Sequence, residues 1–294
     1  MKPRRPSSPQ KENTAAPRQF RIEHHTVLGH RVRVAIWPAD QSKDTSKDKS
    51  KLPLLLFNGI GASLELVTPF VDEFDPSTEV IAFDVPGTGE SPAPRLPYRM
   101  WMLSALASRL VRTLGHERVD AMGVSWGGAL AQQFALQNPR RCRRLILAAT
   151  SQGMLMVPGR LSVLASLMSP RRYNDREYRH KVFGMLYGGQ AAKDPSLITR
   201  FSRFMRPTSR KGYLLQQLAI MGWTSLPWLP LIKQPTLVMA GDDDPVIPLV
   251  NAQLMAHLIP SARLQVMHDG HIFVLSQSAR SAALVGDFLG AAAA

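Results

Sequence analysis

The residues best suited to chemistry form the run Gly123-Val124-Ser125-Trp126-Gly127. A serine with glycines two positions away on either side, after a strand-like apolar run and before a helical pattern, is typical of a nucleophile elbow. Glycine leaves room where a side chain would meet the adjoining strand and helix. The positive end of the following helix favours negative charge beside the serine. We therefore predict that Ser125 is the nucleophile of an acyl-transfer reaction.

A serine hydroxyl needs a base to take its proton and a third group to orient that base. In elbow sites a carboxylate and then a histidine follow the serine along the chain. The run Gly241-Asp242-Asp243-Asp244-Pro245 follows an apolar strand pattern, and sites in open parallel sheets gather at the carboxyl ends of strands. We predict Asp244 as the acid and keep Asp242 as the alternative. The other aspartates of the run are expected to shape the turn.

The predicted base lies in the run Asp269-Gly270-His271, which follows the last apolar strand pattern. His271 is favoured because Gly270 provides a flexible turn from which the imidazole can reach the serine. His268 is the alternative, although it stands at the end of the strand itself. The remaining histidines show no spacing typical of metal ligands, so no metal site is predicted.

Acyl transfer also creates a negatively charged oxygen that must accept hydrogen bonds, each worth about 2.7–4 kcal/mol in the transition state. The first predicted donor is the backbone N–H of Trp126, the residue after the nucleophile. The second is the backbone N–H of Ile60, in the turn Asn58-Gly59-Ile60-Gly61 that follows another apolar run. Together these two amides form the predicted oxyanion hole.

Two further patterns look like binding sites but lack an essential part. The segment Gly87-Thr88-Gly89 follows a strand pattern, but Pro92 occupies the third glycine position of a dinucleotide fingerprint. No NAD, FAD or other cofactor is therefore predicted. The arginine-rich stretch 160–211 lacks a recognised nucleic-acid module, so no nucleic-acid partner is expected.

The elements that position these residues are short apolar runs alternating with helical patterns, which predict an α/β fold with a mostly parallel central sheet flanked by helices. The elbow and the order of its partners identify this fold as the α/β-hydrolase fold. An antiparallel hairpin is predicted at 21–27 and 30–37. Further strands are predicted at 54–57, 80–83, 119–124, 145–147, 235–239 and 264–267, and helices at 98–114, 127–137 and 279–289.

No strand pattern interrupts residues 151–232, which we interpret as an inserted helical cap. The α/β core then comprises 21–150 and 233–294. Residues 1–20 are polar and proline-rich and are predicted to form a disordered basic arm. Residues 41–51, rich in lysine, serine and aspartate, are predicted to form an exposed loop.

Composition narrows the class of protein. The 294 residues are 45% hydrophobic and 20% charged, which is ordinary for a globular protein. Cys142 is the only cysteine, no apolar stretch suggests a signal peptide, and no run reaches the ~18 apolar residues of a membrane span. We therefore expect a cytoplasmic protein without a transmembrane segment.

The formal charge of +14 is concentrated in two stretches. Residues 1–51 hold twelve Lys or Arg against five Asp or Glu, and residues 160–211 hold twelve against three. Such stretches either contact an anionic surface or keep the protein in solution.

Beyond the elbow, further motifs occur in the core and in the predicted cap: Phe57 to Ala62, Ile81 to Gly87, Gly123 to Gln133, Ser169 to Tyr173, Gly222 to Ser225 and Gly241 to Pro248. Through these motifs the chain resembles, from about residue 20 to 285, the intracellular depolymerases of medium-chain-length poly(3-hydroxyalkanoate). The resemblance implies Ser125, Asp244 and His271 as the triad of a reaction that needs no cofactor.

The reaction implied by the resemblance is hydrolysis of polyester bonds in storage granules, through an acyl-serine intermediate, to 3-hydroxy acids or oligomers. A basic cap suits a granule coated with anionic lipid or protein. The alternatives are a soluble carboxylesterase, lipase or cofactor-free perhydrolase with the same triad, or a non-catalytic granule-binding protein. Apolar cap residues are expected to line the acyl pocket or to meet the granule: Met156, Val157, Trp223, Trp228 and Leu229.

Overall fold

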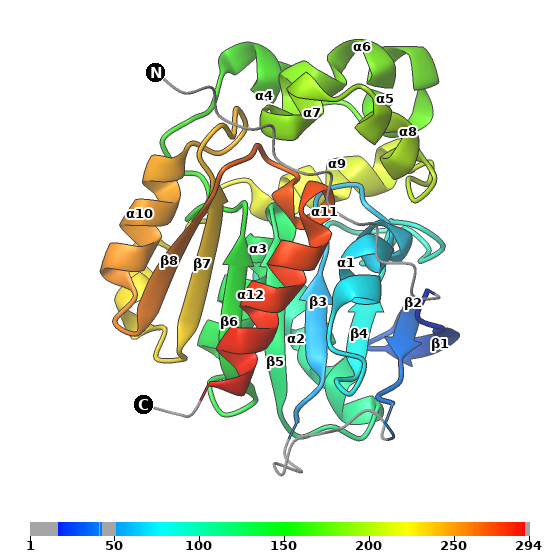
Figure 1. The fold of residues 1–294 in the computed structure, drawn as a ribbon. Helices are drawn as coiled ribbons and strands as arrows, with labels where there is room; N and C mark the ends of the chain where they lie inside the picture. The colour runs from blue at the N-terminus through cyan, green and yellow to red at the C-terminus, as the bar shows by residue number, and fades with distance from the viewer. Residues whose placement is uncertain (1–16, 41, 43–50, 292–294) are drawn as a thin grey trace.

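A single eight-stranded sheet runs through the computed structural model, which describes residues 17–40, 42 and 51–291 (Figure 1). The strand order is β1-β2-β4-β3-β5-β6-β7-β8. The hairpin of β1 and β2 pairs antiparallel with β4, whereas β3 to β8 run parallel. The predicted α/β fold with a mostly parallel sheet is confirmed.

The strands follow the apolar runs of the sequence closely. Residues of β3, β4 and β7 are buried along their whole length because helices cover both faces of the sheet. The strand bounds are β1 Arg21–Val27, β2 His30–Trp37, β3 Leu54–Phe57, β4 Val80–Phe83, β5 Val119–Val124, β6 Cys142–Ala148, β7 Thr236–Gly241 and β8 Ala262–Met267.

Two hydrophobic clusters, one on each face of the sheet, form the core. Fully buried side chains such as Phe134 on one face and Phe70 on the other each stabilise the fold by about 1.5–3 kcal/mol. The first face is covered by α2 (Met100–Thr113), α3 (Trp126–Gln137) and α10 (Leu249–Leu258). The second is covered by η2 (Leu64–Val67), α1 (Thr68–Glu73), α11 (Phe273–Ser276) and α12 (Ser278–Gly290).

Residues 151–232, which we call the cap, are mainly helical and lie across the carboxyl ends of the parallel strands (Figure 1). Side-chain caps begin two of these helices: Asp175 accepts from the N–H of Tyr178, and Ser209 accepts from that of Gly212. The cap elements are α4 (Leu161–Leu167), α5 (Arg171–Asn174), α6 (Arg176–Tyr187), α7 (Gly189–Lys193), α8 (Ser196–Ser202), α9 (Arg210–Ile220) and η3 (Leu226–Leu231).

Near the N-terminus the structure departs from the predicted disorder. Residues 1–16 of the predicted arm lie outside the described residues, but residues 17–20 are ordered on the core. Arg18 donates to the carbonyl oxygen of Thr78 at 3.0 Å, and its N–H donates to Asp72 at 3.0 Å. The ring of Phe20 packs 4.9 Å from that of Trp37. The prediction failed here because these contacts join residues far apart in sequence.

The remaining departures are small. Helices α1 and α10 were not predicted, and β6 begins three residues before the predicted strand. Residues 41 and 43–50 of the predicted loop lie outside the described residues. None of the helices within the described ranges is both long and apolar enough for a membrane span.

Candidate active site

Ser125 occupies a strained turn between β5 and α3. Its φ of 54° and ψ of −121° are unusual for a residue with a side chain. The turn is held by three hydrogen bonds: the N–H of Ser125 donates to Ala148 at 2.9 Å, and its carbonyl accepts from Gly128 N–H at 2.8 Å and the Thr150 hydroxyl at 2.7 Å. The predicted elbow is therefore present at the carboxyl end of a central strand.

The glycines of the motif are required by close backbone approaches. A Cβ on Gly123 would lie 2.3 Å from the carbonyl oxygen of Gly127, and a Cβ on Gly127 would lie 2.2 Å from that of Phe57. Because all the nearest atoms of both positions belong to backbone, they cannot move aside cheaply. Glycine at both positions thus lets the strand, the turn and the helix pack together.

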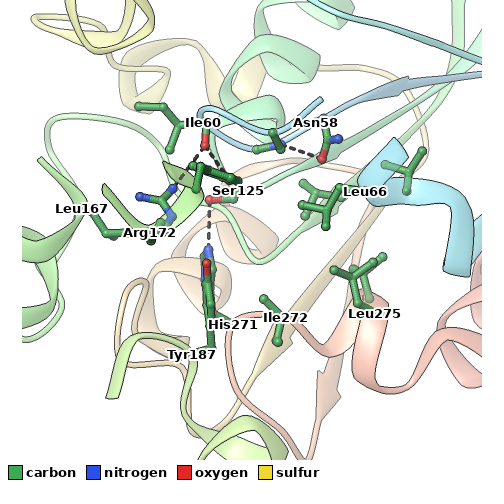
Figure 2. Close-up of a pocket in the computed structure, with 16 residues that line it drawn as sticks. Asn58, Ile60, Leu66, Ser125, Leu167, Arg172, Tyr187, His271, Ile272 and Leu275 are labelled. Carbon is green, nitrogen blue, oxygen red and sulfur yellow. Dashed lines mark hydrogen bonds between the residues drawn. The ribbon is translucent and has the colours of Figure 1, made fainter. Parts of the chain in front are cut away.

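The structure brings together the three residues predicted as a triad. Nε2 of His271 lies 3.0 Å from Oγ of Ser125 (Figure 2). Its Nδ1 lies 2.7 Å from Oδ2 of Asp244. His271 and Asp244 are each 8% exposed. This is the geometry in which an imidazole accepts the serine proton while a carboxylate holds its tautomer.

The other carboxylate oxygen of Asp244 is fixed by the backbone. Oδ1 accepts from the N–H groups of Val246 and Ile247 at 2.8 and 2.9 Å. The two alternatives from the sequence lie elsewhere and pair with each other at the surface, with 2.6 Å between Asp242 Oδ2 and His268 Nδ1. Neither alternative residue contacts Ser125.

The cap fixes the loop that carries His271. The N–H of His271 donates to the carbonyl oxygen of Tyr187 at 2.7 Å, and the two rings stack with centroids 6.5 Å apart (Figure 2). Asp243, the third aspartate of its run, accepts from the N–H of Gly189 at 2.8 Å. Gly270 has no room for a Cβ because the carbonyl oxygen of Tyr187 lies 1.8 Å from that position. The loop that carries the base is therefore held by close contact with the cap, and glycine is required at position 270 because no side chain fits there.

The predicted oxyanion donors flank the serine. The turn after β3 approaches the nucleophile closely, since a Cβ on Gly59 would lie 3.7 Å from that of Ser125. Within the described part of the chain, neither the backbone N–H of Ile60 nor that of Trp126 donates a hydrogen bond. Both amides are thus available to an oxygen beside Ser125.

The buried carboxyl group of Asp84 holds the segment that follows the oxyanion turn. Oδ1 of Asp84 accepts from the N–H of Leu64 at 2.8 Å, and Oδ2 lies 3.4 Å from Nη1 of Arg33. Burial raises the pKa of Asp84 to about 7, although the backbone hydrogen bond and Arg33 lower it. This residue links the loop after β4 to the segment that follows the turn.

Two pockets meet at the nucleophile, and both contain Ser125, Ile60 and Leu167 in their walls. The first has a volume of about 90 Å³ and lies among the residues drawn in Figure 2, including Leu66, Tyr187, Ile272 and Leu275. The second has a volume of about 610 Å³ and an apolar wall that includes Met154, Met156, Leu164, Met168, Ile220, Met221 and Ile247. An ester bound at Ser125 therefore has apolar space on both sides.

Of the five apolar cap residues predicted to contact substrate, only Met156 lines either pocket. Val157 and Trp228 are exposed away from both, whereas Leu229 is fully buried in the core. The indole of Trp223 donates to Gln133 at 2.7 Å. These four residues do not line the pockets, because apolar character does not reveal which way a cap side chain faces. Leu229 and Trp223 pack on the core, whereas contact of the exposed Val157 and Trp228 with a granule stays a prediction.

Several pocket residues were missed from the sequence. Arg172 and Tyr173 belong to a run used only as evidence of resemblance, yet both line the first pocket. Tyr187, Leu66 and Leu275 also line it, and no spacing pattern connects them to Ser125. Among the described residues, no three His, Cys, Asp or Glu side chains gather as a metal ion would require.

Comparison with known proteins agrees with this geometry. A model of the alpha/beta hydrolase fold family matches residues 53–277. The chain is 49% identical over 237 residues to a poly(3-hydroxyalkanoate) depolymerase of Ectopseudomonas oleovorans, which covers 81% of this chain and 84% of that protein. It is 30% identical to a 2-hydroxymuconate semialdehyde hydrolase of Pseudomonas putida, over 81% and 86% of the two chains.

Among solved structures, the enol-lactonase of Burkholderia xenovorans LB400 superposes with a TM-score of 0.76 at 22% identity, covering 92% of this chain and all of that one. A carboxylesterase of Bacillus subtilis gives the same TM-score at 16% identity, over 94% and 93% of the two chains. At these identities the likeness concerns the fold alone.

Proposed function

From the premise that this chain belongs to the α/β-hydrolase family, we propose that it is a poly(3-hydroxyalkanoate) depolymerase with Ser125, His271 and Asp244 as its catalytic triad. The hydrogen-bonded chain from Ser125 through His271 to Asp244 supports the reaction type. The 49% identity to a poly(3-hydroxyalkanoate) depolymerase over most of both chains supports the substrate.

The reaction proceeds by two acyl transfers. His271 takes the proton of Ser125 as Oγ attacks the ester carbonyl carbon, and the oxyanion accepts from the N–H groups of Ile60 and Trp126. His271 then gives the proton to the leaving alkoxide, which departs as the hydroxyl end of one polymer fragment. A water molecule, deprotonated by His271, then attacks the carbonyl carbon of the acyl-serine. His271 returns the proton to Oγ of Ser125 as the acyl–oxygen bond breaks, which releases the carboxylic acid and restores the serine.

The two-sided site suits an internal bond of a polyester, which carries repeating units on both the acyl and the alcohol side. We further propose that the polymer has medium-length side chains. The second pocket is far larger than a methyl side chain needs, and each methylene group buried there contributes about 0.8 kcal/mol.

We also propose that the enzyme acts on storage granules in the cytoplasm. Met154, Met168 and Met221 line the second pocket and are 60%, 66% and 55% exposed, so apolar surface continues from the site to the outside. The basic cap supports approach to an anionic coat. If the variant Arg200→Gln/Arg203→Gln binds granules as tightly as the wild type at low salt, this role of cap charge is refuted.

The substrate is tested by incubating the protein with isolated medium-chain-length polyester granules and measuring released 3-hydroxy acids. The wild type is expected to degrade the granules and Ser125→Ala is expected to be inactive. A wild-type protein that cleaves only short p-nitrophenyl esters would be a carboxylesterase. A protein that binds granules but cleaves neither substrate would be a non-catalytic granule-binding protein.

Pocket size is tested within one helix. Ile220 lines the second pocket, whereas Leu214 of the same helix does not. We expect Ile220→Trp to lower the hydrolysis of p-nitrophenyl octanoate relative to the acetate, and Leu214→Trp to leave that ratio unchanged. Equal ratios in both variants contradict the assignment of this pocket to the substrate side chain.

A further inference from the structure

The cap holds the oxyanion turn by both polar atoms of one peptide unit. The carbonyl oxygen of Ile60 accepts from Nη2 of Arg172 at 3.2 Å and from the hydroxyl of Tyr173 at 2.9 Å (Figure 2 shows the arginine beside this carbonyl). At the other end of the unit, the N–H of Gly61 donates to Oε1 of Gln216 at 2.8 Å. This Ile60–Gly61 peptide cannot rotate without breaking these three contacts. It directly follows the Gly59–Ile60 peptide, whose N–H is the predicted oxyanion donor, so it limits how that donor can turn.

The same cap residue also contacts the other half of the oxyanion hole. The backbone carbonyl of Gln216 in α9 accepts from the indole N–H of Trp126 at 3.0 Å, and Gln216 is 1% exposed. One residue of the cap therefore touches Trp126 with its backbone and the turn containing Ile60 with its side chain.

Packing around the turn is equally close. Gly61 has a φ of +73°, and a Cβ there would lie 2.8 Å from the rings of both Tyr173 and Tyr213. The cap tyrosines thus fill the space beside the turn. Any movement of α5 or α9 away from the core would remove both the packing and the hydrogen bonds.

Arg172 is only 4% exposed, and no Asp or Glu side chain forms an ion pair with it in the described ranges. Its Nη1 donates to the hydroxyl of Tyr213 at 2.7 Å, and its guanidinium lies 4.6 Å from the centre of the Tyr173 ring. Because a buried cation without a carboxylate is costly, its contact with the Ile60 carbonyl indicates a role at the site.

We propose that Arg172, Tyr173 and Gln216 are positioning residues that keep the Ile60 amide aimed at the oxyanion only while the cap is seated on the core. The proposal rests on the proposed acyl-transfer function. None of the three residues reacts with the substrate. They act by fixing the turn, so that displacement of the cap would release the turn that carries the oxyanion donor.

The test removes these hydrogen bonds with side chains of similar size, so that no large cavity is left beside the turn. Tyr173→Phe deletes one donor to Ile60, and Tyr173→Phe/Gln216→Met also deletes the acceptor for Gly61 N–H. The matched control is Tyr98→Phe, which deletes a buried hydroxyl that donates to the carbonyl of Pro86 at 3.0 Å, away from Ser125. The assay is hydrolysis of p-nitrophenyl octanoate, with thermal unfolding measured in parallel.

Loss of an oxyanion donor costs about 10²–10³ in kcat, so we expect the double variant to lose about tenfold to a hundredfold in kcat, with KM nearly unchanged. Tyr173→Phe alone should lose less, and Tyr98→Phe nothing. Affinity for a trifluoromethyl ketone, which mimics the tetrahedral oxyanion, should fall in proportion to kcat. If these residues had a purely structural role, the variants would have lower melting temperatures, but their affinity for the ketone would not fall in proportion to kcat.

The proposal is overturned if kcat stays within twofold of the wild type, if Tyr98→Phe loses as much, or if the ketone binds equally well to all variants. Should the double variant fail to fold, Tyr173→Phe alone decides the matter by the same readouts. A wild type that cleaves the octanoate but not granules refutes the polymer substrate and leaves this test intact. A wild type inactive on both refutes both proposals.

Discussion

Replacing Asp244 with asparagine should abolish catalysis while preserving the fold, and the direction of the new amide follows from the structure. Oδ1 of Asp244 accepts two backbone N–H groups, from Val246 and Ile247. An amide NH₂ at that position would face two donors, so the asparagine must keep its carbonyl oxygen there. Its NH₂ group then points at Nδ1 of His271, where it must donate.

An imidazole that accepts at Nδ1 carries its proton on Nε2 and cannot take the proton of Ser125. Inverting the tautomer in this way costs about 10⁴ in kcat in a serine protease triad, which corresponds to about 5.5 kcal/mol of transition-state stabilisation. We expect a loss of similar size for Asp244→Asn. KM should change little because the side chain does not line either pocket.

The matched control is Asp242→Asn, in the same loop. Its side chain also pairs with a histidine, but His268 is at the surface. Hydrolysis of p-nitrophenyl octanoate and the rate of labelling by a serine-reactive phosphonate would be measured for both variants. The reasoning is refuted if Asp244→Asn retains more than a tenth of wild-type activity, or if Asp242→Asn loses as much as Asp244→Asn.

Three further predictions concern the scaffold. Burial raises the pKa of Asp84 from 3.8 to about 7. Between these two pH values the folded state therefore binds more protons than the unfolded state. Stability should then fall as pH rises from about 4 to 7, by at most about 1.4 kcal/mol per pH unit, and urea unfolding should show a flatter profile for Asp84→Asn. Gly127→Ala should lower the melting temperature sharply or prevent folding, whereas Gly286→Ala, in open space on α12, should stabilise by about 0.5–1 kcal/mol; equal melting temperatures would contradict this. Burial raises the pKa of the Cys142 thiol, so a disulfide reagent should label it only in denaturant, and rapid labelling of the native protein would contradict its buried position.

The reacting groups were predictable because local patterns encode them. Ser125 sits in a motif whose glycines are demanded by backbone contacts, and the acid and base follow strands whose apolar runs are unmistakable. The choice between His271 and His268 was also accessible, since only the former follows a glycine. Strands β3 and β4 were predictable because burial on both faces leaves no polar positions in them.

The surroundings of these groups were less predictable. Helix α10 is apolar nearly all round and shows no amphipathic period, and α1 is short with a proline in its first turn. The contacts of Arg172 and Gln216 with the oxyanion turn join residues 112 and 155 positions apart. Such contacts depend on how the cap settles on the core, which no local pattern in the sequence describes.

The central claim is that Ser125 becomes acylated by a polyester during turnover. It is tested most directly by quenching the enzyme in acid shortly after mixing with a medium-chain 3-hydroxyalkanoate oligomer and locating the adduct by peptide mass spectrometry. We predict a 3-hydroxyacyl group on the peptide that contains Ser125, and no adduct in Ser125→Ala. Hydrolysis of the oligomer by Ser125→Ala at the wild-type rate, or an adduct on another residue, would contradict the claim.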